Sequence, residues 1–332
     1  MTTQITVLGL GKIGMSIGLA LASQKSSLLR LGNDRDLSLM RHAEKIGAFD
    51  KTDVNLHSAV ENAGVVVLDL PVDEIEETLE IIAEDLRPGA VVVDTSPVKV
   101  AVAEIAARIL GPERYFVTLT PSINPAYLEE ISTGLDAAHA DLFKNSMMTI
   151  TSTPGTHPGA IELATDLAAL LGGKAFFVDP MESDGLLAAS HTLPALLAAA
   201  LVHTATDQPG WVEGRKLAGQ EFFLTTRPVE HLDESKQLGQ SALMNRENVL
   251  RVIDTLVNSL EDLRDMIDRQ DAEALSEYLA QARDNRAQWI RQRMSANWDA
   301  GGPSAMQSVP SAGEMLGKLV GIRPKKEGDR RR

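Results

Sequence analysis

Short apolar runs alternate with segments of helical periodicity through the first half of the chain. Runs of Val, Ile and Leu predict buried strands at Ile5–Leu8, Leu28–Gly32, Val65–Leu70, Ala90–Asp94, Tyr115–Leu119 and Met147–Thr151. Between them, apolar positions at helical spacing predict helices over Met15–Ser23, Leu37–Ile46 and Asp73–Leu86. A last helix-and-strand step begins at Pro158. This alternation is typical of βαβ units, so we predict a Rossmann-type, doubly wound α/β domain with a mostly parallel sheet over residues 1–180.

The pattern changes after Asp179-Pro180. From Met181 to about Trp298 the apolar residues recur at helical spacing and no strand is predicted. We therefore expect an all-helical second domain over residues 181–300. Its long amphipathic stretch, Asn245–Met294, fits either an ordinary core or a dimer interface, and we predict a homodimer through this domain. The tail, residues 301–332, is rich in Gly, Pro and Ser and ends in basic residues, so we expect it to be disordered.

Composition narrows the class of protein. The chain has 332 residues, a net charge of −14 and no cysteine. The negative charge argues against a nucleic-acid partner, and the lack of cysteine excludes a disulfide scaffold and a thiolate nucleophile. We see no signal peptide and expect a cytoplasmic protein. The most apolar stretch, Leu186–Val202, is shorter than the roughly 20 residues of a membrane span and predicts a buried core helix, so no membrane partner is expected.

A glycine-rich turn between the first strand and the first helix predicts a dinucleotide site. Gly9 permits a tight turn, Gly11 lets a diphosphate approach the backbone, and Gly14 allows close packing of helix on strand. Asp34 follows at the end of the second strand, where it would accept hydrogen bonds from the adenosine ribose. The acid favours NAD, because a carboxylate repels a 2′-phosphate. Arg35 beside it could pair with that phosphate, so NADP stays open.

Three later strands end in polar turns, where ligands of an open parallel sheet bind. They end at Asp69-Leu70-Pro71, Asp94-Thr95-Ser96-Pro97 and Thr118-Leu119-Thr120-Pro121. Leu70 and Pro71 would line the nicotinamide. Ser96, Thr120 and Asn124 are suited to hold a substrate hydroxyl or carbonyl, although strand ends also need such residues as turn and cap residues. Lys99 could bind a phosphate or carboxylate, and an exposed lysine at a helix start is the simpler interpretation.

Two residues of the helical half could handle a substrate. His191 lies in the apolar run of residues 186–202, where it is either a core histidine with a partner or a group that moves a proton. Arg227 is suited to grip a carboxylate through paired hydrogen bonds. The seven histidines show no metal-ligand spacing, so no metal is predicted, and the chain has neither a GxSxG elbow nor a Walker lysine. The remaining reaction class is hydride transfer.

The chain resembles the prephenate/arogenate dehydrogenases of tyrosine biosynthesis. The resemblance runs from Ile5 to about Asp254 through "VLGLGKIGMSIGLAL", "GNDRD", "VVLDLPVDEIEETL", "VVVDTSPVK", "GLDAAHADLF", "ASHTLPALLAAAL" and "LTTR…LMNRENVL". It implies a Rossmann domain that binds NAD or NADP, a helical domain that dimerises, and oxidative decarboxylation of a cyclohexadienyl carboxylate. Under the resemblance His191 matches the family's Ser-His-x-Pro histidine, with Pro194 shifted by one place, and Arg227 matches its substrate-binding arginine.

The chain departs from the family at several positions. Thr120 stands where the family usually has the histidine that contacts the substrate hydroxyl, and Ser96 lies one place before the family's serine, at Pro97. A family His-Asp pair becomes Ser183-Asp184. Three interpretations stay open: Ser96, Thr120 and Asn124 handle a different substrate, His191 takes over the proton, or catalysis has been lost. A Rossmann dehydrogenase or reductase for another small carboxylate and a non-catalytic cofactor-binding homologue are therefore the alternatives.

Overall fold

The computed structural model describes residues 3–24, 27–130 and 134–296. The described chain divides into two compact units. The first contains residues up to Pro180 together with the end of the last helix from Ala287, and the second is Met181–Arg286.

The first unit is built on one eight-stranded sheet. Its strands are β1 (Thr3–Leu8), β2 (Leu28–Asn33), β3 (Lys51–Thr52), β4 (Ala63–Leu68), β5 (Val91–Asp94), β6 (Tyr115–Pro121), β7 (Met147–Thr151) and β8 (Lys174–Phe177). Their order in the sheet is β3-β2-β1-β4-β5-β6-β7-β8, and all neighbours are parallel except β6 and β7. The prediction of a doubly wound, mostly parallel sheet is confirmed.

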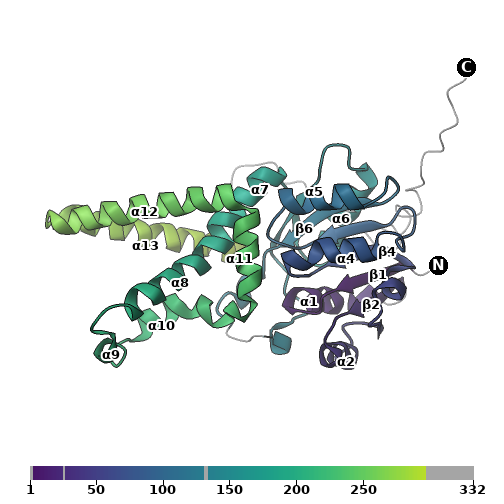
Figure 1. Ribbon diagram of the computed structural model, residues 1–332, viewed down its shortest axis with the longest axis horizontal. Helices are drawn as coiled ribbons and strands as arrows, with labels where there is room; N and C mark the ends of the chain where they lie inside the picture. The colour runs from purple at the N-terminus through teal and green to yellow at the C-terminus, as the bar shows by residue number, and fades with distance from the viewer. Residues whose placement is uncertain (1–2, 25–26, 131–133, 297–332) are drawn as a thin grey trace, which may run out of the picture. The chain divides into compact units, whose positions relative to one another are not determined.

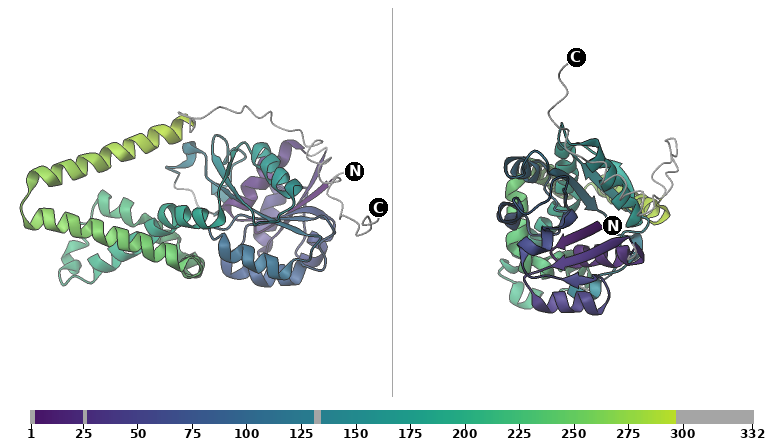
Figure 2. Two further views of the ribbon diagram at one scale, coloured as in Figure 1. Left: turned by 90° about the horizontal axis from the view of Figure 1, so that it is seen from above. Right: turned by 90° about the vertical axis from the view of Figure 1, so that its right-hand side faces the viewer.

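Helices cover both faces of this sheet (Figures 1 and 2). They are α1 (Lys12–Ala20), α2 (Leu37–Lys45), α3 (Leu56–Val60), α4 (Ile75–Ile82), α5 (Val100–Ile109) and α6 (Pro158–Leu170), with short 3-10 turns at Leu21–Gln24, Val72–Glu74, Pro125–Tyr127 and Gly134–Ala137. Figure 2 shows α4 and α5 on the face opposite α1 and α6. Each central strand contributes apolar side chains to both helix layers, because alternate residues of a strand point to opposite faces of the sheet.

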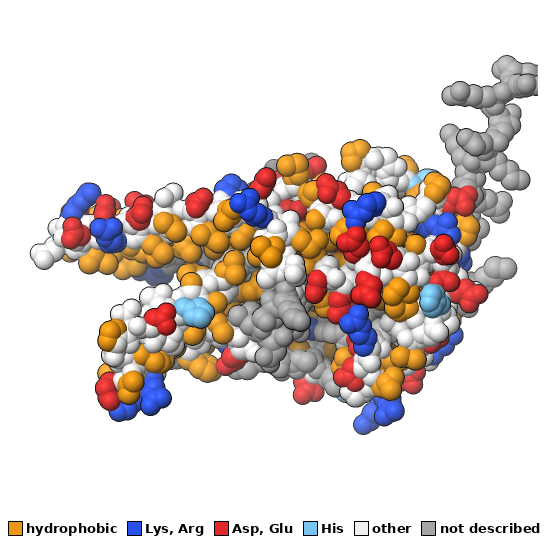
Figure 3. All heavy atoms as spheres, in the orientation of Figure 1, with side chains coloured by type: hydrophobic (Ala, Val, Ile, Leu, Met, Phe, Trp, Pro, Cys, Tyr) orange, Lys and Arg blue, Asp and Glu red, His pale blue; other side chains and the backbone are white. Residues whose placement is uncertain are grey.

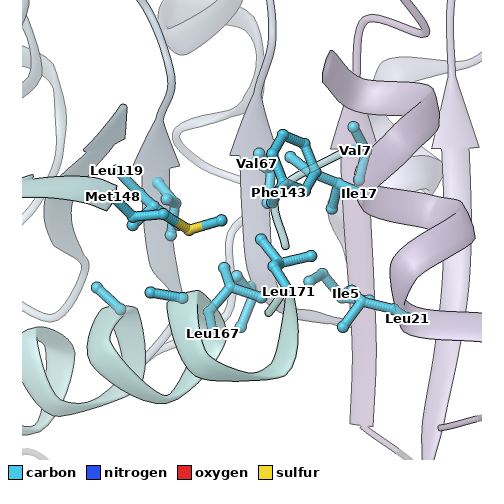
Figure 4. Packing of buried hydrophobic residues seen from close by; sticks show 14 of the residues in the cluster. Ile5, Val7, Ile17, Leu21, Val67, Leu119, Phe143, Met148, Leu167 and Leu171 are labelled. Carbon is cyan, nitrogen blue, oxygen red and sulfur yellow. The ribbon is translucent and has the colours of Figure 1, made fainter. Parts of the chain in front are cut away.

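The main core lies between the sheet and the helices α1 and α6 (Figure 4). Ile5 and Val7 of β1 and Val67 of β4 face Ile17 of α1 and Leu167 of α6, all at most 1% exposed. The apolar runs met in the sequence are thus buried on both faces, as expected of central parallel strands. This packing fixes the strand ends, from which the functional groups project.

The second unit is entirely helical in its described residues. It contains α7 (Pro180–Leu187), a π-helical turn η5 (Ala188–Thr192), α8 (Leu193–Thr206), α9 (Trp211–Gly214), α10 (Gln220–Thr226), a 3-10 segment η6 (Arg227–Glu234), α11 (Ser235–Met244), α12 (Arg246–Asp268) and most of α13 (Ala272–Ser295). The expectation of an all-helical second half is confirmed for these residues. The predicted disordered tail, residues 301–332, lies outside the described residues.

The apolar helix of this unit is less buried than predicted. Pro180–Thr206 forms one continuous helical stretch that is long and apolar enough to cross a membrane by length and composition alone. Only 22% of its most apolar window is buried within the chain. The prediction that this helix is buried in a core is therefore wrong for a single copy of the chain. The described small core of this unit contains Ala188, Val249 and Val252, and it covers one side of the helix only.

Candidate functional site

The glycine-rich turn joins β1 to α1 in a conformation that requires glycine. Gly9 has φ +93°, and a Cβ there would lie 2.0 Å from the Asp69 carbonyl oxygen. A Cβ at Gly14 would lie 2.1 Å from the Gly9 carbonyl oxygen. Gly11 is the exposed N-cap residue of α1, so its backbone faces outward without a side chain. The turn therefore offers backbone amides and a helix N-terminus to an approaching anion.

Asp34 lies against this turn. Its Oδ2 accepts a hydrogen bond from the Leu10 amide at 2.8 Å, and its Oδ1 accepts one from the Asp36 amide at 2.8 Å. A carboxylate offers about four acceptor positions, so two remain for the hydroxyls of a ribose. The acid, the glycines and the outward-facing Gly11 backbone together fit a dinucleotide. The structure thus brings together the predicted residues Gly9, Gly11, Gly14 and Asp34.

Arg35 is held in an ion pair with Glu74. Its Nη1 lies 2.9 Å from Glu74 Oε1, just after β4, and its side chain is 74% exposed. A guanidinium held by a carboxylate is less ready to pair with a phosphate, although an exposed pair of this kind is weak. Leu70 and Pro71, predicted to line the nicotinamide, follow β4 and are half-buried. A Cβ at Gly9 would lie 3.3 Å from Leu70 Cδ2, so Leu70 borders the same turn.

The end of β5 carries a buried ionic network. Asp94 and Lys99 are both fully buried, with Lys99 Nζ 3.2 Å from Asp94 Oδ2. Ser96 Oγ donates to Asp94 Oδ2 at 2.8 Å, and the Lys99 ammonium also donates to the Ser96 carbonyl oxygen. The interpretation of Lys99 as an exposed helix-start lysine is wrong. A carboxylate buried at a strand end needs a counter-charge, and Lys99, five residues on, supplies it.

Thr120 and Ser96 lie on neighbouring strand ends. Thr120 belongs to β6, is 9% exposed, and its Oγ1 donates to the Ser96 carbonyl oxygen at 3.3 Å. Asn124 is also buried, but its side chain is occupied by its own loop. Its Oδ1 accepts from the Ala126 amide at 3.1 Å and its Nδ2 donates to the Asp141 carbonyl oxygen at 3.1 Å. The role of Asn124 as a substrate ligand thus stays a prediction from sequence.

A cluster of titratable side chains beside α1 was not predicted. Glu130 accepts from Lys12 Nζ at 3.4 Å, and its Oε1 lies 2.6 Å from His139 Nε2. Burial raises the pKa of Glu130, but hydrogen bonds from His139 and Lys12 outweigh burial and leave it below its ordinary value. The stacked rings of Tyr127 and His139, 4.1 Å apart, complete the cluster. The loop between β6 and β7 has no periodic pattern, so its sequence gives no signal for these contacts.

The other predicted residues lie in the second unit. His191 is on the π-helical turn η5 and is exposed, with Nδ1 3.0 Å from Ser190 Oγ. The alternative of a buried core histidine is therefore wrong. Arg227 is half-buried at the end of α10. Ser183 and Asp184 are buried in α7, and Ser183 Oγ has no hydrogen-bond partner among the described residues.

Asp69, predicted as part of a strand end where ligands bind, also contacts the glycine turn. It follows β4 directly, and its Oδ2 accepts a hydrogen bond from the Gly14 amide at 2.7 Å. Its Oδ1 accepts from Thr95 Oγ1 at 2.9 Å. The position of Asp69 in the sequence could have indicated this contact. β1 and β4 are neighbours in a doubly wound sheet, so their ends meet at the switch point. Among the described residues no group of three or more His, Asp or Glu side chains is arranged to hold a metal.

Comparison with known proteins assigns the family. Sequence profiles of prephenate dehydrogenase match both parts of the chain, the nucleotide-binding domain over residues 17–177 and the dimerization domain over residues 179–281. The prephenate dehydrogenase of Bacillus subtilis is 28% identical over 292 residues, which cover 86% of this chain and 76% of that protein.

Solved structures agree with the profiles. The prephenate dehydrogenase of A. aeolicus, in complex with hydroxyphenyl propionate and NAD+, has the same fold, with a TM-score of 0.76 at 23% identity over 87% of this chain and 98% of that chain. The arogenate dehydrogenase of Synechocystis gives a TM-score of 0.69 at 25% identity over 86% of this chain and 100% of that chain. With both profiles in order along the chain, the protein belongs to the prephenate dehydrogenase family of oxidoreductases.

Proposed function

We propose that the protein is an NAD-dependent dehydrogenase that oxidatively decarboxylates a cyclohexadienyl carboxylate of the prephenate or arogenate type. The observation that carries the proposal is the glycine turn with the Asp34 carboxylate held against it at the switch point of the sheet. The family match supports the substrate class, since the relatives are prephenate and arogenate dehydrogenases. This support outweighs the alternatives of another small carboxylate or a non-catalytic homologue.

Two contacts favour NAD over NADP. The Asp34 carboxylate faces the turn where the adenosine ribose would lie, and a 2′-phosphate there would meet like charge. Arg35, the cation that could offset that repulsion, is paired with Glu74 at 2.9 Å. NADP would have to break this pair and also approach Asp34.

The residues divide the chemistry in the following way. Bound NAD supplies the hydride acceptor. Arg227 holds a substrate carboxylate through paired hydrogen bonds. His191, an exposed imidazole with Ser190 Oγ at Nδ1, takes the proton of the substrate hydroxyl as hydride leaves the same carbon. Loss of the ring carboxylate as CO2 then gives the aromatic product.

Ser96 and Thr120 take supporting roles in the proposal. Their hydroxyl protons are directed to Asp94 and to the Ser96 carbonyl oxygen, so the lone pairs of each hydroxyl oxygen can accept a hydrogen bond from a substrate hydroxyl. Thr120 carries no titratable group, so in this position it orients the hydroxyl and does not take its proton.

The second half of the chain supplies the substrate groups and the dimer contact. We assign residues 1–180 to cofactor binding and residues 181–300 to substrate binding and dimerisation. Large apolar side chains of the second unit are exposed in one copy, including Val257, Leu260 and Ile267 of α12. Figure 3 shows hydrophobic side chains gathered along this helix. A second copy would cover them, and the dimerization-domain match over residues 179–281 supports this partner over lipid. The acidic, cysteine-free composition fits a cytoplasmic homodimer without nucleic acid.

The test is a binding and turnover experiment on the purified protein. Fluorescence titration should show tighter binding of NADH than of NADPH, and prephenate or arogenate should support reduction of NAD. Arg227→Ala should raise KM about tenfold or more for the carboxylate substrate while the Kd for NADH stays unchanged. Arg215→Ala, which removes an exposed arginine of the same unit, is the control. Tight NADH binding with no turnover of either substrate would contradict the proposed reaction.

A further inference from the structure

Asp69 places a carboxylate inside the glycine turn. Its backbone amide donates to the Leu8 carbonyl oxygen at 2.8 Å, which fixes the residue beside the end of β1. Its Oδ2 then reaches across the switch point to accept from the Gly14 amide in the first turn of α1 at 2.7 Å. A Cβ at Gly11 would lie 3.6 Å from the same oxygen. The carboxylate therefore lies at the glycine that a diphosphate must approach.

A diphosphate that binds at this turn would lie close to the Asp69 carboxylate. A helix N-terminus stabilises negative charge because its first amides are unpaired, and Asp69 already occupies one of them. Given the dinucleotide cofactor of the proposed function, the cofactor's diphosphate is bound at the same end of α1. We propose that Asp69 is the residue that sets cofactor affinity in this protein, and that its charge weakens dinucleotide binding by repelling the diphosphate.

Three basic side chains that follow strand ends do not offset this repulsion, because each is paired with an acid. Lys12, the cation within the turn itself, is paired with Glu130 at 3.4 Å. Arg35 is paired with Glu74, and Lys99 with Asp94. Asp34 adds another carboxylate at the Leu10 amide. Each of these cations thus has an acidic partner, while two carboxylates accept directly from the backbone of the turn.

A purely structural role for Asp69 makes a different prediction. If Asp69 only capped α1, a neutral side chain that keeps the acceptor oxygen would leave cofactor affinity unchanged. Asparagine keeps that oxygen for the Gly14 amide and removes the charge. The charge and the cap can therefore be separated with Asp69→Asn.

The experiment measures dissociation constants of the full-length protein by calorimetry. The probes are NADH, ADP-ribose and adenosine, and only the first two carry a diphosphate. Asp69→Asn should bind NADH and ADP-ribose about tenfold more tightly than wild type, as removal of one like charge at close range predicts, with adenosine unchanged. The matched control Glu80→Gln removes one exposed negative charge from α4 and should change none of the three constants.

Several results would overturn the proposal. Equal or weaker binding of ADP-ribose by Asp69→Asn, with wild type binding it normally, refutes the role of Asp69 and leaves the cofactor assignment intact. An equal gain in Glu80→Gln would show a general charge effect instead. If neither wild type nor Asp69→Asn binds NADH or ADP-ribose, the proposed function fails together with this inference. Should Asp69→Asn not fold, Asp69→Ser removes the same charge and is held to the same outcomes.

Discussion

Tyr127 illustrates how one hydrogen bond changes the titration of a side chain. Its hydroxyl donates to Asp141 Oδ1 at 2.5 Å, in the loop between β6 and β7. This hydrogen bond, aided by burial and by the charges of Asp141 and Glu130, raises the pKa of Tyr127 to about 12 from its ordinary 10.0. A tyrosinate beside a carboxylate would lose the bond and face like charge, so the neutral form is favoured.

We expect Tyr127 to ionise about two pH units above an ordinary tyrosine. The chain has three tyrosines, so Tyr115→Phe with Tyr278→Phe leaves Tyr127 as the single tyrosine that ionises in an ultraviolet titration. Asp141→Asn in that background should return the midpoint toward pH 10. A midpoint near 10 before Asp141 is changed would contradict the hydrogen bond.

The free energy of unfolding should depend on pH because folding raises the pKa of Tyr127. Because the pKa of Tyr127 is raised in the folded state, its contribution to stability is complete below pH 10 and is lost as the pH rises toward 12. The difference in unfolding free energy between wild type and Tyr127→Phe should therefore be constant below pH 10 and shrink above it.

At the scale of elements, the junction of β5 and α5 depends on the buried Lys99–Asp94 pair. Two charges without solvent contact are stabilised only by each other and by the hydrogen bonds around them. Lys99→Met would leave the Asp94 carboxylate buried without its counter-charge. We expect this change to lower the free energy of unfolding by about 3–5 kcal/mol, measured by denaturant titration at neutral pH.

Two further variants test whether charge is the cause. Lys99→Met with Asp94→Asn removes both charges and should cost less than Lys99→Met alone. Lys12→Met breaks the half-exposed pair with Glu130 and should cost about 1 kcal/mol or less. If Lys99→Met were as stable as Lys12→Met, the pair would not hold the junction.

Element boundaries explain why the contact of Asp69 with α1 was not predicted. The apolar run Val65–Leu70 predicts a strand through Leu70, whereas β4 ends at Leu68. Asp69 therefore leaves the strand and turns toward α1. Two other features of the sheet were not predicted. One is β3, which is only two residues long, and the other is the antiparallel direction of β7. Hydrophobic pattern marks a strand but does not encode its direction.

At the scale of the whole molecule, the second unit exposes large apolar side chains in a single copy of the chain. Along α12, Leu250, Val257, Leu260 and Ile267 are each more than 40% exposed, and their spacing of seven and three residues places them on one face. Figure 3 shows hydrophobic side chains following one another along this helix. Such a stripe in one copy is typical of an interface that a partner covers.

We expect a dimer in solution whose mass is twice that of one chain, measured by light scattering after size-exclusion chromatography. Val257→Glu with Leu260→Glu should shift the protein to the mass of one chain, because an unpaired charge in an apolar interface is costly. Thr255→Glu adds a charge on the opposite side of α12 and should leave the dimer intact. A wild-type protein with the mass of one chain would contradict the homodimer.

The sequence by itself determined the elements and the glycine turn after the first strand. Apolar periodicity marked the central strands and the change to helices after Pro180, because it records which side chains leave water on folding. The glycine spacing and Asp34 predicted a dinucleotide site, because the required backbone conformation and the acid both lie within one βαβ unit. These signals are local and can be read without knowing the path of the chain.

Only the tertiary structure decided which side chains meet. Asp69 reaches Gly14 across 55 residues, Thr120 reaches the Ser96 carbonyl oxygen from the next strand, and Lys99 is buried against Asp94. His191 is exposed to solvent although it lies in the apolar run of residues 186–202. Such contacts depend on strand order and on the path of the loops, which bring distant residues within the roughly 3 Å of a hydrogen bond. No local pattern in the sequence records that distance.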